Sequence, residues 1–143
     1  MTQDDSPPAA AQPDRFAHAR EAQAVALLED YVEMIGDLMA ELGEARVADI
    51  ALRMGVAQPT ATKAVARLKR EGLAVSRPYR GVFLTDSGAE LADRVRARHR
   101  TVVAFLVAVG VPEEVAELDA EGMEHHVSAT TLRAFEAFLA EKG

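Results

Sequence analysis

Apolar residues recur along this chain at the spacing of helix faces, with one short extended stretch in the middle. Between Phe16 and Leu42 they return every three or four positions, which predicts one long amphipathic helix ending at Gly43. Shorter helices are predicted at residues 47–54 and from Pro59 to residue 70, because proline has no N–H and fits the first turn of a helix. The residues predicted to face inward are Val25, Leu28, Val32, Ile35, Met39, Val47, Ile50, Ala51, Ala61, Val65 and Leu68.

The pattern changes after Gly72 to that of a β-hairpin. Residues 73–77 and 82–85 have the composition of strands, and the turn at 78–81 contains both Pro and Gly. A capping-box pattern at residues 87–90 then predicts the start of a long helix that runs to about Val109. Short helices are predicted after Pro112, at residues 113–118, 121–127 and 128–142. The predicted fold class is therefore mainly α with a small β-hairpin.

The order of these elements predicts the domain organisation. Two helices joined by a short turn and followed by a hairpin form a winged helix-turn-helix, whose second helix enters the DNA major groove. We therefore predict a DNA-binding domain at residues 16–88 and a second, helical domain at residues 89–143. Residues 1–15 are rich in Pro, Ala, Gln and Asp, which predicts a disordered tail.

The net charge of −7 is unexpected for a DNA-binding protein until it is divided along the chain. Residues 46–100 carry twelve Lys and Arg against five acidic residues, whereas residues 29–45 carry six acidic residues and no basic one. Residues 101–143 carry two basic residues against eight acidic ones. A basic middle between acidic flanks fits a phosphate-facing surface in one domain and cation-binding carboxylates elsewhere.

The predicted DNA contacts come from the second helix of the helix-turn-helix and from the tip of the hairpin. Thr60, Lys63 and Arg67 fall on the helix face opposite the apolar stripe, where they can approach bases and phosphates. The full predicted set is Gln58, Pro59, Thr60, Thr62, Lys63, Arg67, Arg77, Tyr79 and Arg80. The alternative interpretation is a solvated helix face without DNA contact, with Tyr79 packed inside its own turn.

Several classes of protein are excluded or disfavoured by composition. The chain has no cysteine, so disulfides, thiolate metal sites and cysteine nucleophiles are excluded. The longest apolar stretch, Val102 to Val111, is far shorter than the roughly 20 residues that cross a membrane. The first residues also lack the basic start and apolar block of a secretory signal. We therefore expect a cytoplasmic protein that makes no use of a membrane.

Three groups of polar residues have the character of metal ligands. Asp30 and Glu33 share a face of the first helix, and His99 interrupts the apolar stripe of the long helix. The third group is Glu121, Glu124 and His125, spaced to project from one helical turn. Oxygen and imidazole ligands without thiolate suit Mn²⁺ or Fe²⁺, although Zn²⁺ and other divalent metals also bind such sets. Singly, the acidic pair could be solvated, His99 could be hydrogen-bonded in the core, and His126 could replace His125.

The order of these motifs resembles the diphtheria toxin repressor family of metal-dependent regulators, and most closely its manganese-responsive branch. The similarity covers residues 27–139. Its marks are residues 29–33 (EDYVE), 46–51 (RVADIA), 56–68, 79–81 (YRG), 84–85, 98–99, Val111 and 121–126 (EGMEHH).

The resemblance implies a site, an assembly and an effector. It implies that the metal ligands are Asp30, Glu33, His99, Glu121, Glu124 and His125, with His126 outside the ligand set. It also implies that residues 89–143 form a metal-binding and dimerisation domain of a homodimer. Iron-responsive relatives typically have Met at the position of Asp30 and Cys at that of Glu121, so the oxygen ligands here indicate manganese. Because the printed chain ends at Gly143, we expect no third, SH3-like domain.

The predicted function is a manganese-responsive regulator that binds double-stranded operator DNA and represses metal-uptake genes when metal is bound. Two alternatives belong to other classes. One is a di-metal carboxylate enzyme, whose helical sites use Glu and His three residues apart, whereas Glu121 and His125 are four apart. The other is a winged-helix regulator of a small organic ligand, which would leave the carboxylate and histidine groups unexplained.

Overall fold

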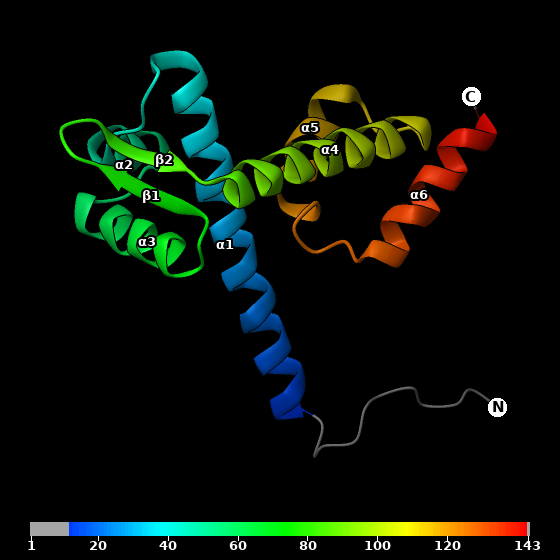
Figure 1. Ribbon diagram of the computed structural model, residues 1–143. Coiled ribbons are helices and arrows are strands. Elements are labelled where there is room, and N and C mark those ends of the chain that lie inside the picture. Colours follow the sequence, from blue (N-terminus) through cyan, green and yellow to red (C-terminus); the bar gives the residue numbers. More distant parts are fainter. Residues whose placement is uncertain (1–11, 143) are drawn as a thin grey trace.

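The computed structural model describes residues 12–142, which form two lobes joined by two long helices (Figure 1). The helices are α1 (Gln12–Leu42), α2 (Val47–Met54), α3 (Gln58–Arg70), α4 (Asp86–Ala108), α5 (Glu113–Met123) and α6 (Ala129–Lys142). The strands β1 (Ala74–Arg77) and β2 (Gly81–Leu84) form one antiparallel hairpin. The predicted fold class, mainly α with a small hairpin, is confirmed.

The N-terminal lobe has one hydrophobic core, to which α1, α2, α3 and the hairpin all contribute. Ala61, Val65 and Leu68 of α3 are buried, as their spacing predicted, and they pack with Ile50 and Ala51 of α2. From α1 the buried side chains are Tyr31, Val32, Ile35 and Leu38. Burying a side chain of this size stabilises a fold by roughly 1.5–3 kcal/mol, so this core determines the position of α3.

The prediction for α1 was wrong at its start and in part of its apolar stripe. The helix begins at Gln12, before the predicted Phe16, so part of the predicted tail is helical; residues 1–11 lie outside the described part of the chain. Val25 is 42% exposed, because the first half of α1 projects beyond the N-terminal lobe (Figure 1). Tyr31 and Leu38 occupy core positions that the apolar spacing did not predict for them.

The hairpin is held to the rest of the lobe through Ala45. The strands pair from Ala74 with Leu84 to Arg77 with Gly81, and Val82 N–H donates to the Ala45 carbonyl at 2.7 Å. Gly81 has a φ of +100°, and a Cβ there would lie 2.6 Å from the same carbonyl oxygen. Glycine is therefore required where the wing returns to the core.

The start of α4 differs from the predicted capping box. Thr85, not Ser87, is the N-cap, and its hydroxyl accepts a hydrogen bond from Gly88 N–H at 3.1 Å. The same hydroxyl donates to the Gly72 carbonyl at 2.6 Å, which ties the helix start to the end of α3. At Gly88 a Cβ would lie 2.1 Å from the Leu73 carbonyl oxygen, so α4 passes very close to the start of the hairpin.

The C-terminal lobe consists of α5 and α6 packed on the second half of α4 (Figure 1). Phe105 of α4 stacks on Phe135 of α6 with ring centroids 3.9 Å apart. The predicted helices at 113–118 and 121–127 are one helix, α5, which ends at Met123; Glu124 to His126 form the turn that follows. Within residues 12–142, no helix combines the length and apolar character that crossing a membrane requires.

Candidate metal centre and nucleic-acid interface

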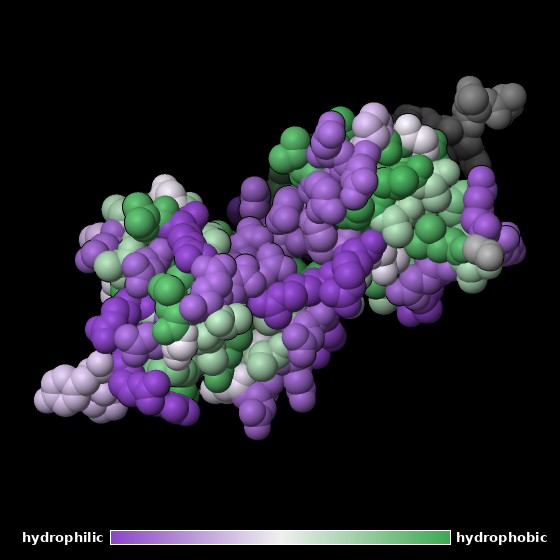
Figure 2. Space-filling view, turned by 90° about the horizontal axis from the view of Figure 1, so that it is seen from above, coloured by the Kyte–Doolittle hydropathy of each residue, from purple (hydrophilic) through white to green (hydrophobic). Residues whose placement is uncertain are grey.

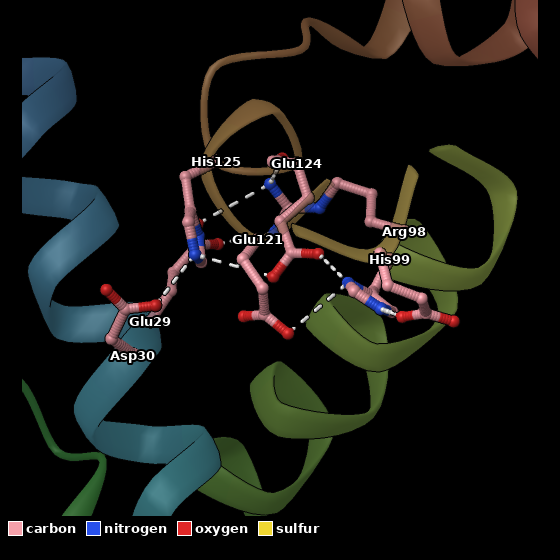
Figure 3. A network of polar contacts seen from close by, with 8 residues as sticks. Glu29, Asp30, Arg98, His99, Glu121, Glu124 and His125 are labelled. Atoms are coloured by element: carbon pink, nitrogen blue, oxygen red, sulfur yellow. Dashed lines mark hydrogen bonds and ion pairs between the residues drawn. The ribbon is translucent and has the colours of Figure 1, made fainter. Parts of the chain in front are cut away.

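Five of the six predicted ligands converge on one place, where α1, α4 and the turn after α5 meet (Figure 3). Asp30 comes from α1, His99 from α4, Glu121 from the end of α5, and Glu124 and His125 from the following turn. These segments are far apart in the sequence, and the two long helices bring them together. The site therefore joins the N-terminal lobe to the C-terminal lobe.

His99 is the centre of the first group of contacts. Its Nδ1 lies 2.5 Å from a carboxylate oxygen of Glu124 and 3.8 Å from one of Glu121. His99, Glu121 and Glu124 each offer one ligand atom within 4.8 Å of the others, which is the spacing of ligands around a single ion. The other ring nitrogen, Nε2, lies 2.7 Å from Glu117 on the outer side of the group.

His125 is the centre of the second group. Its Nε2 lies 2.7 Å from Asp30 and 3.5 Å from Glu124, while its Nδ1 lies 3.0 Å from Glu29. The side chains of His125 and Glu124 are 3% and 1% exposed. Because Glu124 contacts both histidines through its two oxygens, it connects the two groups.

The donor atoms of this second group fit a cation. Glu124 Oε1 and His125 Nε2 are buried and have no hydrogen-bond partner among the described residues; the approach of Nε2 to Asp30 is an ion-pair contact without hydrogen-bond geometry. A buried polar atom without a partner costs roughly 1–3 kcal/mol, and proteins seldom retain two side by side. A divalent cation would satisfy both atoms, and the set of carboxylate oxygens and imidazole nitrogens suits the harder first-row metals.

The pKa values of three groups in this site are shifted upward, which favours their protonated forms. Burial raises the pKa of Glu124 from 4.5 to about 7, although its hydrogen bond to His99 opposes the shift. Contacts with Asp30 and Glu29 raise the pKa of His125 from 6.5 to about 10. Burial opposes protonation of His99, but its hydrogen bonds to Glu117 and Glu124 outweigh this and raise its pKa. Metal must therefore displace protons to bind.

Glu33 takes a more distant place than the sequence predicted. It lies one turn along α1 from Asp30 but outside the compact group of His99, Glu121 and Glu124. Its pKa is raised by burial and by the charges of Glu121 and Asp37. Glu33 is therefore influenced by the charge of Glu121, but it forms no hydrogen bond or ion pair with the other predicted ligands among the described residues.

Three residues of the site were missed at the level of sequence: Glu29, Arg98 and Glu117. Glu29 is 4% exposed and pairs with Arg98, which also donates to the Glu124 carbonyl at 3.0 Å. A signal existed for Glu29, because it interrupts the apolar positions Val25 and Val32 at helical spacing. Glu117 stands one turn before Glu121, so the two share a face of α5.

His126, which the resemblance placed outside the ligand set, is exposed.

Six of the nine predicted nucleic-acid contacts come from α3. Gln58, Pro59, Thr60, Thr62 and Lys63 are exposed along α3, and Arg67 is partly exposed. Helix α3 begins at Gln58, so Pro59 is its second residue and not its first. Neither Lys63 nor Arg67 has an ion-pair partner among residues 12–142.

The hairpin carries the second half of the predicted interface. Tyr79 is 97% exposed with a φ of +64°, so the idea that it packs inside its turn is wrong. Arg77 and Arg80 lie over the Phe83 ring at 4.6 and 5.5 Å, which places both guanidinium groups at the wing. The Arg46 guanidinium donates to the Tyr79 carbonyl at 3.2 Å and holds the tip.

A winged helix-turn-helix, tied to a helical lobe by a carboxylate and histidine site, defines a metal-responsive DNA-binding regulator. Comparison with known proteins agrees. Residues 24–82 match a family model described as the iron dependent repressor N-terminal DNA binding domain. Residues 85–142 match the metal binding and dimerisation domain of the same family.

Individual relatives are similar over most of the chain. The transcriptional regulator MntR of Escherichia coli O6:H1 is 52% identical over 128 residues, 90% of this chain and 83% of the relative. The HTH-type transcriptional regulator MntR of Bacillus subtilis is 41% identical over 71% of each chain. Among solved structures, the manganese regulator SloR is 28% identical with a TM-score of 0.68 over 79% of this chain. This chain covers 53% of the length of SloR.

The chain belongs to the iron-dependent repressor family, in its MntR branch. The prediction of a DNA-binding regulator of the manganese-responsive branch, and not an enzyme, is confirmed. The two alternatives, a di-metal enzyme and a regulator of a small organic ligand, receive no support from these comparisons.

Proposed function

We propose that this protein is a homodimeric, manganese-responsive repressor that binds operator DNA when its site is loaded. The proposed ligands are Asp30, Glu33, His99, Glu121, Glu124 and His125. The proposed DNA contacts are Gln58, Pro59, Thr60, Thr62, Lys63, Arg67, Arg77, Tyr79 and Arg80. Such a regulator acts on the chromosome, so its place is the cytoplasm.

The observation that carries the proposal is the pair of buried, unpartnered ligand atoms on Glu124 and His125. They face Asp30 from α1 and lie next to the group of His99, Glu121 and Glu124. Because the site holds four of its six proposed ligands as carboxylates, a bound Mn²⁺ would supply the positive charge that removes their mutual repulsion. Hard oxygen ligands favour manganese over softer metals of higher raw affinity.

The position of the site explains how occupancy could reach the DNA. Helix α1 carries core residues of the N-terminal lobe, so a change in α1 moves α3 with it. Asp30 and Glu33 hold the α1 side of the site, while His99 and the turn at residues 124–125 hold the other. Drawing the two sides together stabilises one position of the DNA-binding lobe relative to α4, which is a shift in population between two arrangements.

Dimerisation would convert this change in the position of the DNA-binding lobe into operator recognition. Apolar side chains gather on the surface of the C-terminal lobe (Figure 2), where Val107, Val109, Val115 and Leu118 are exposed. A second copy placed against this lobe would bury them and set the distance between two α3 helices. Dimeric helix-turn-helix proteins read two half-sites whose separation matches that distance.

The direct test is operator binding at controlled metal levels. The chelator-treated protein is titrated into labelled operator DNA, with and without added manganese chloride, at one fixed salt concentration. We expect tight binding only with manganese, and its loss in Glu124→Gln, which removes the carboxylate shared by both histidines. Glu141→Gln, exposed on α6, serves as the matched control. Equal affinity in chelator and in manganese would refute the proposal.

A further inference from the structure

We propose that the buried ion pair of Glu29 and Arg98 is a positioning device that holds His125 and the backbone of Glu124 ready for metal. Neither residue is among the proposed ligands. The inference rests on the proposed function of the site, and it concerns how two of the ligands are kept in place.

Glu29 holds the imidazole of His125 from behind. One of its oxygens lies 3.0 Å from His125 Nδ1, and its other oxygen is paired with Arg98. An imidazole whose Nδ1–H is donated to a carboxylate presents Nε2 as its ligand atom. That Nε2 is the nitrogen that faces Asp30 and Glu124. Glu29 therefore fixes both the direction of the ring and the nitrogen that it offers.

Arg98 fixes the turn on which both ligands stand. Its guanidinium donates to the Glu124 carbonyl at 3.0 Å and to Glu29 through its other arm. This carbonyl lies at the C-terminal end of α5, where the last carbonyls of a helix have no partner within the helix. A planar, two-armed guanidinium can serve both acceptors at once, which a lysine ammonium does less well. One buried pair thereby connects α1, α4 and the turn after α5.

The Glu29–Arg98 pair is more deeply buried than the Asp37–Arg96 pair, which also links α1 to α4. The side chains of Arg98 and Glu29 are 18% and 5% exposed. Arg96 and Asp37 also link α4 to α1, at 3.0 Å, but they are 35% and 45% exposed and form no hydrogen bond or ion pair with a proposed ligand. A buried ion pair contributes little net stability compared with apolar residues of similar size. The Glu29–Arg98 pair is thus better explained by the ligands that it holds than by stability.

The test replaces the pair as a unit. In Glu29→Met combined with Arg98→Met, neither buried charge is left alone, so we expect a folded protein with a melting temperature close to that of the wild type. Manganese chloride is titrated into the metal-free full-length chain by calorimetry. We expect the affinity to fall about 10–100-fold, the range typical when a partner of a ligand is removed. The matched control, Glu41→Met with Arg53→Met, removes an exposed ion pair between α1 and α2 and is expected to stay within about threefold of the wild type, since that pair contacts none of the ligands.

Two single variants make the assignment specific. Glu29→Gln keeps an oxygen that can accept the His125 N–H, so it should retain more affinity than the double variant. Arg98→Lys keeps the charge but not the two-armed contact, and a several-fold loss at unchanged melting temperature is expected even if the double variant fails to fold. Wild-type affinity in the folded double variant, or in Arg98→Lys, would overturn the inference. If the wild type itself binds no manganese, the proposed function fails and this inference with it.

Discussion

The imidazole of His125 lies 2.7 Å from the carboxylate of Asp30, across the junction of the two lobes. Asp30 belongs to the helix that supports the DNA-binding lobe, whereas His125 belongs to the turn that ends α5. The contact is close enough for an ion pair, yet it lacks the geometry of a hydrogen bond. If both residues bind the metal as proposed, this contact would couple the occupancy of the site to the position of α3.

Metal affinity should depend strongly on pH. The pKa of His125 is raised to about 10 and that of Glu124 to about 7, so His125 holds a proton at neutral pH and Glu124 gains one as the pH falls below about 7. A bound metal would displace these protons. We expect manganese affinity to rise between about pH 6 and pH 8 by about tenfold per pH unit for each proton displaced. Calorimetry in buffers of different ionisation enthalpy counts these protons directly. An affinity independent of pH would contradict the protonated state of the metal-free site.

The stability of the metal-free protein should show the opposite trend at lower pH. The carboxyl of Glu124 titrates near 4.5 in an unfolded chain, and its pKa rises to about 7 in the folded one. Between these values the folded protein holds a proton that the unfolded chain has released, so the free energy of unfolding falls as pH rises from about 4.5 to about 7. Glu124→Gln should flatten this dependence, which urea unfolding at several pH values would measure.

Much of the N-terminal lobe could be predicted because its pattern is local. Helix α2 and the buried face of α3 follow directly from apolar spacing and from Gly55 and Pro59. The start of α4 could not be predicted in this way. Thr85 caps the helix through its hydrogen bond with Gly88 N–H, and its hydroxyl is also held by the Gly72 carbonyl, which lies thirteen residues earlier in the chain. Likewise α5 ends at Met123, and Arg98 meets the Glu124 carbonyl just beyond it.

The candidate site was predictable as a set of residue types but not as an arrangement. Spacing placed Asp30 and His99 on helix faces, and only the packing of α1 on α4 brings them to one junction. The positioning residues were missed because their signal is tertiary: Glu29 is recognised by its burial beside Arg98 and His125. Spacing along one helix carries no information about such partners.

The salt dependence of operator binding measures how many DNA phosphates the protein neutralises. Lys63→Ala and Arg67→Ala each remove a cation from the exposed face of α3, so each should weaken operator binding. The log–log salt slope should also fall by about 0.9 for each phosphate that the protein no longer neutralises. Manganese affinity should stay unchanged, because neither residue approaches the metal site. Arg133→Ala, on α6 of the other lobe, is the control. Wild-type slopes in both variants would show that these residues form a solvated face.

The wing should be sensitive to a single methyl group. Gly81→Ala meets both a φ of +100° and an oxygen 2.6 Å from the new Cβ, whereas Gly110→Ala meets a φ of +108° in open space. We expect Gly110→Ala to cost about 1 kcal/mol and Gly81→Ala clearly more, within the roughly 1–3 kcal/mol typical of backbone strain or above it. Urea unfolding measures both. Equal losses of stability in the two variants would mean that the Ala45 carbonyl moves away from the new Cβ at little cost.

The metal preference should change when two oxygen ligands are replaced by sulfur. Asp30→Met with Glu121→Cys introduces the softer residues that iron-responsive relatives typically have at these positions. Raw affinity rises from manganese toward copper, so a manganese site depends on hard ligands and on geometry for its selectivity. Replacing a carboxylate by a thioether also removes one negative charge, which weakens binding of a hard ion most. We therefore expect the operator-binding response to shift from manganese toward ferrous iron and later metals.

The measurement is anaerobic operator binding by the wild type and the double variant, each titrated with manganese and with ferrous iron, with circular dichroism to verify folding. Asp30 is expected to matter through its contact with His125, and Glu121 through the group that it forms with His99 and Glu124. A matched double variant, Asp14→Met with Glu141→Cys, changes the same residue types at exposed positions outside the ligand set and should respond to manganese like the wild type. If the folded Asp30→Met, Glu121→Cys variant also responds to manganese like the wild type, these two carboxylates do not determine the metal preference. Two hard ligands would then have been removed without weakening the response to manganese, the metal that depends most on hard ligands.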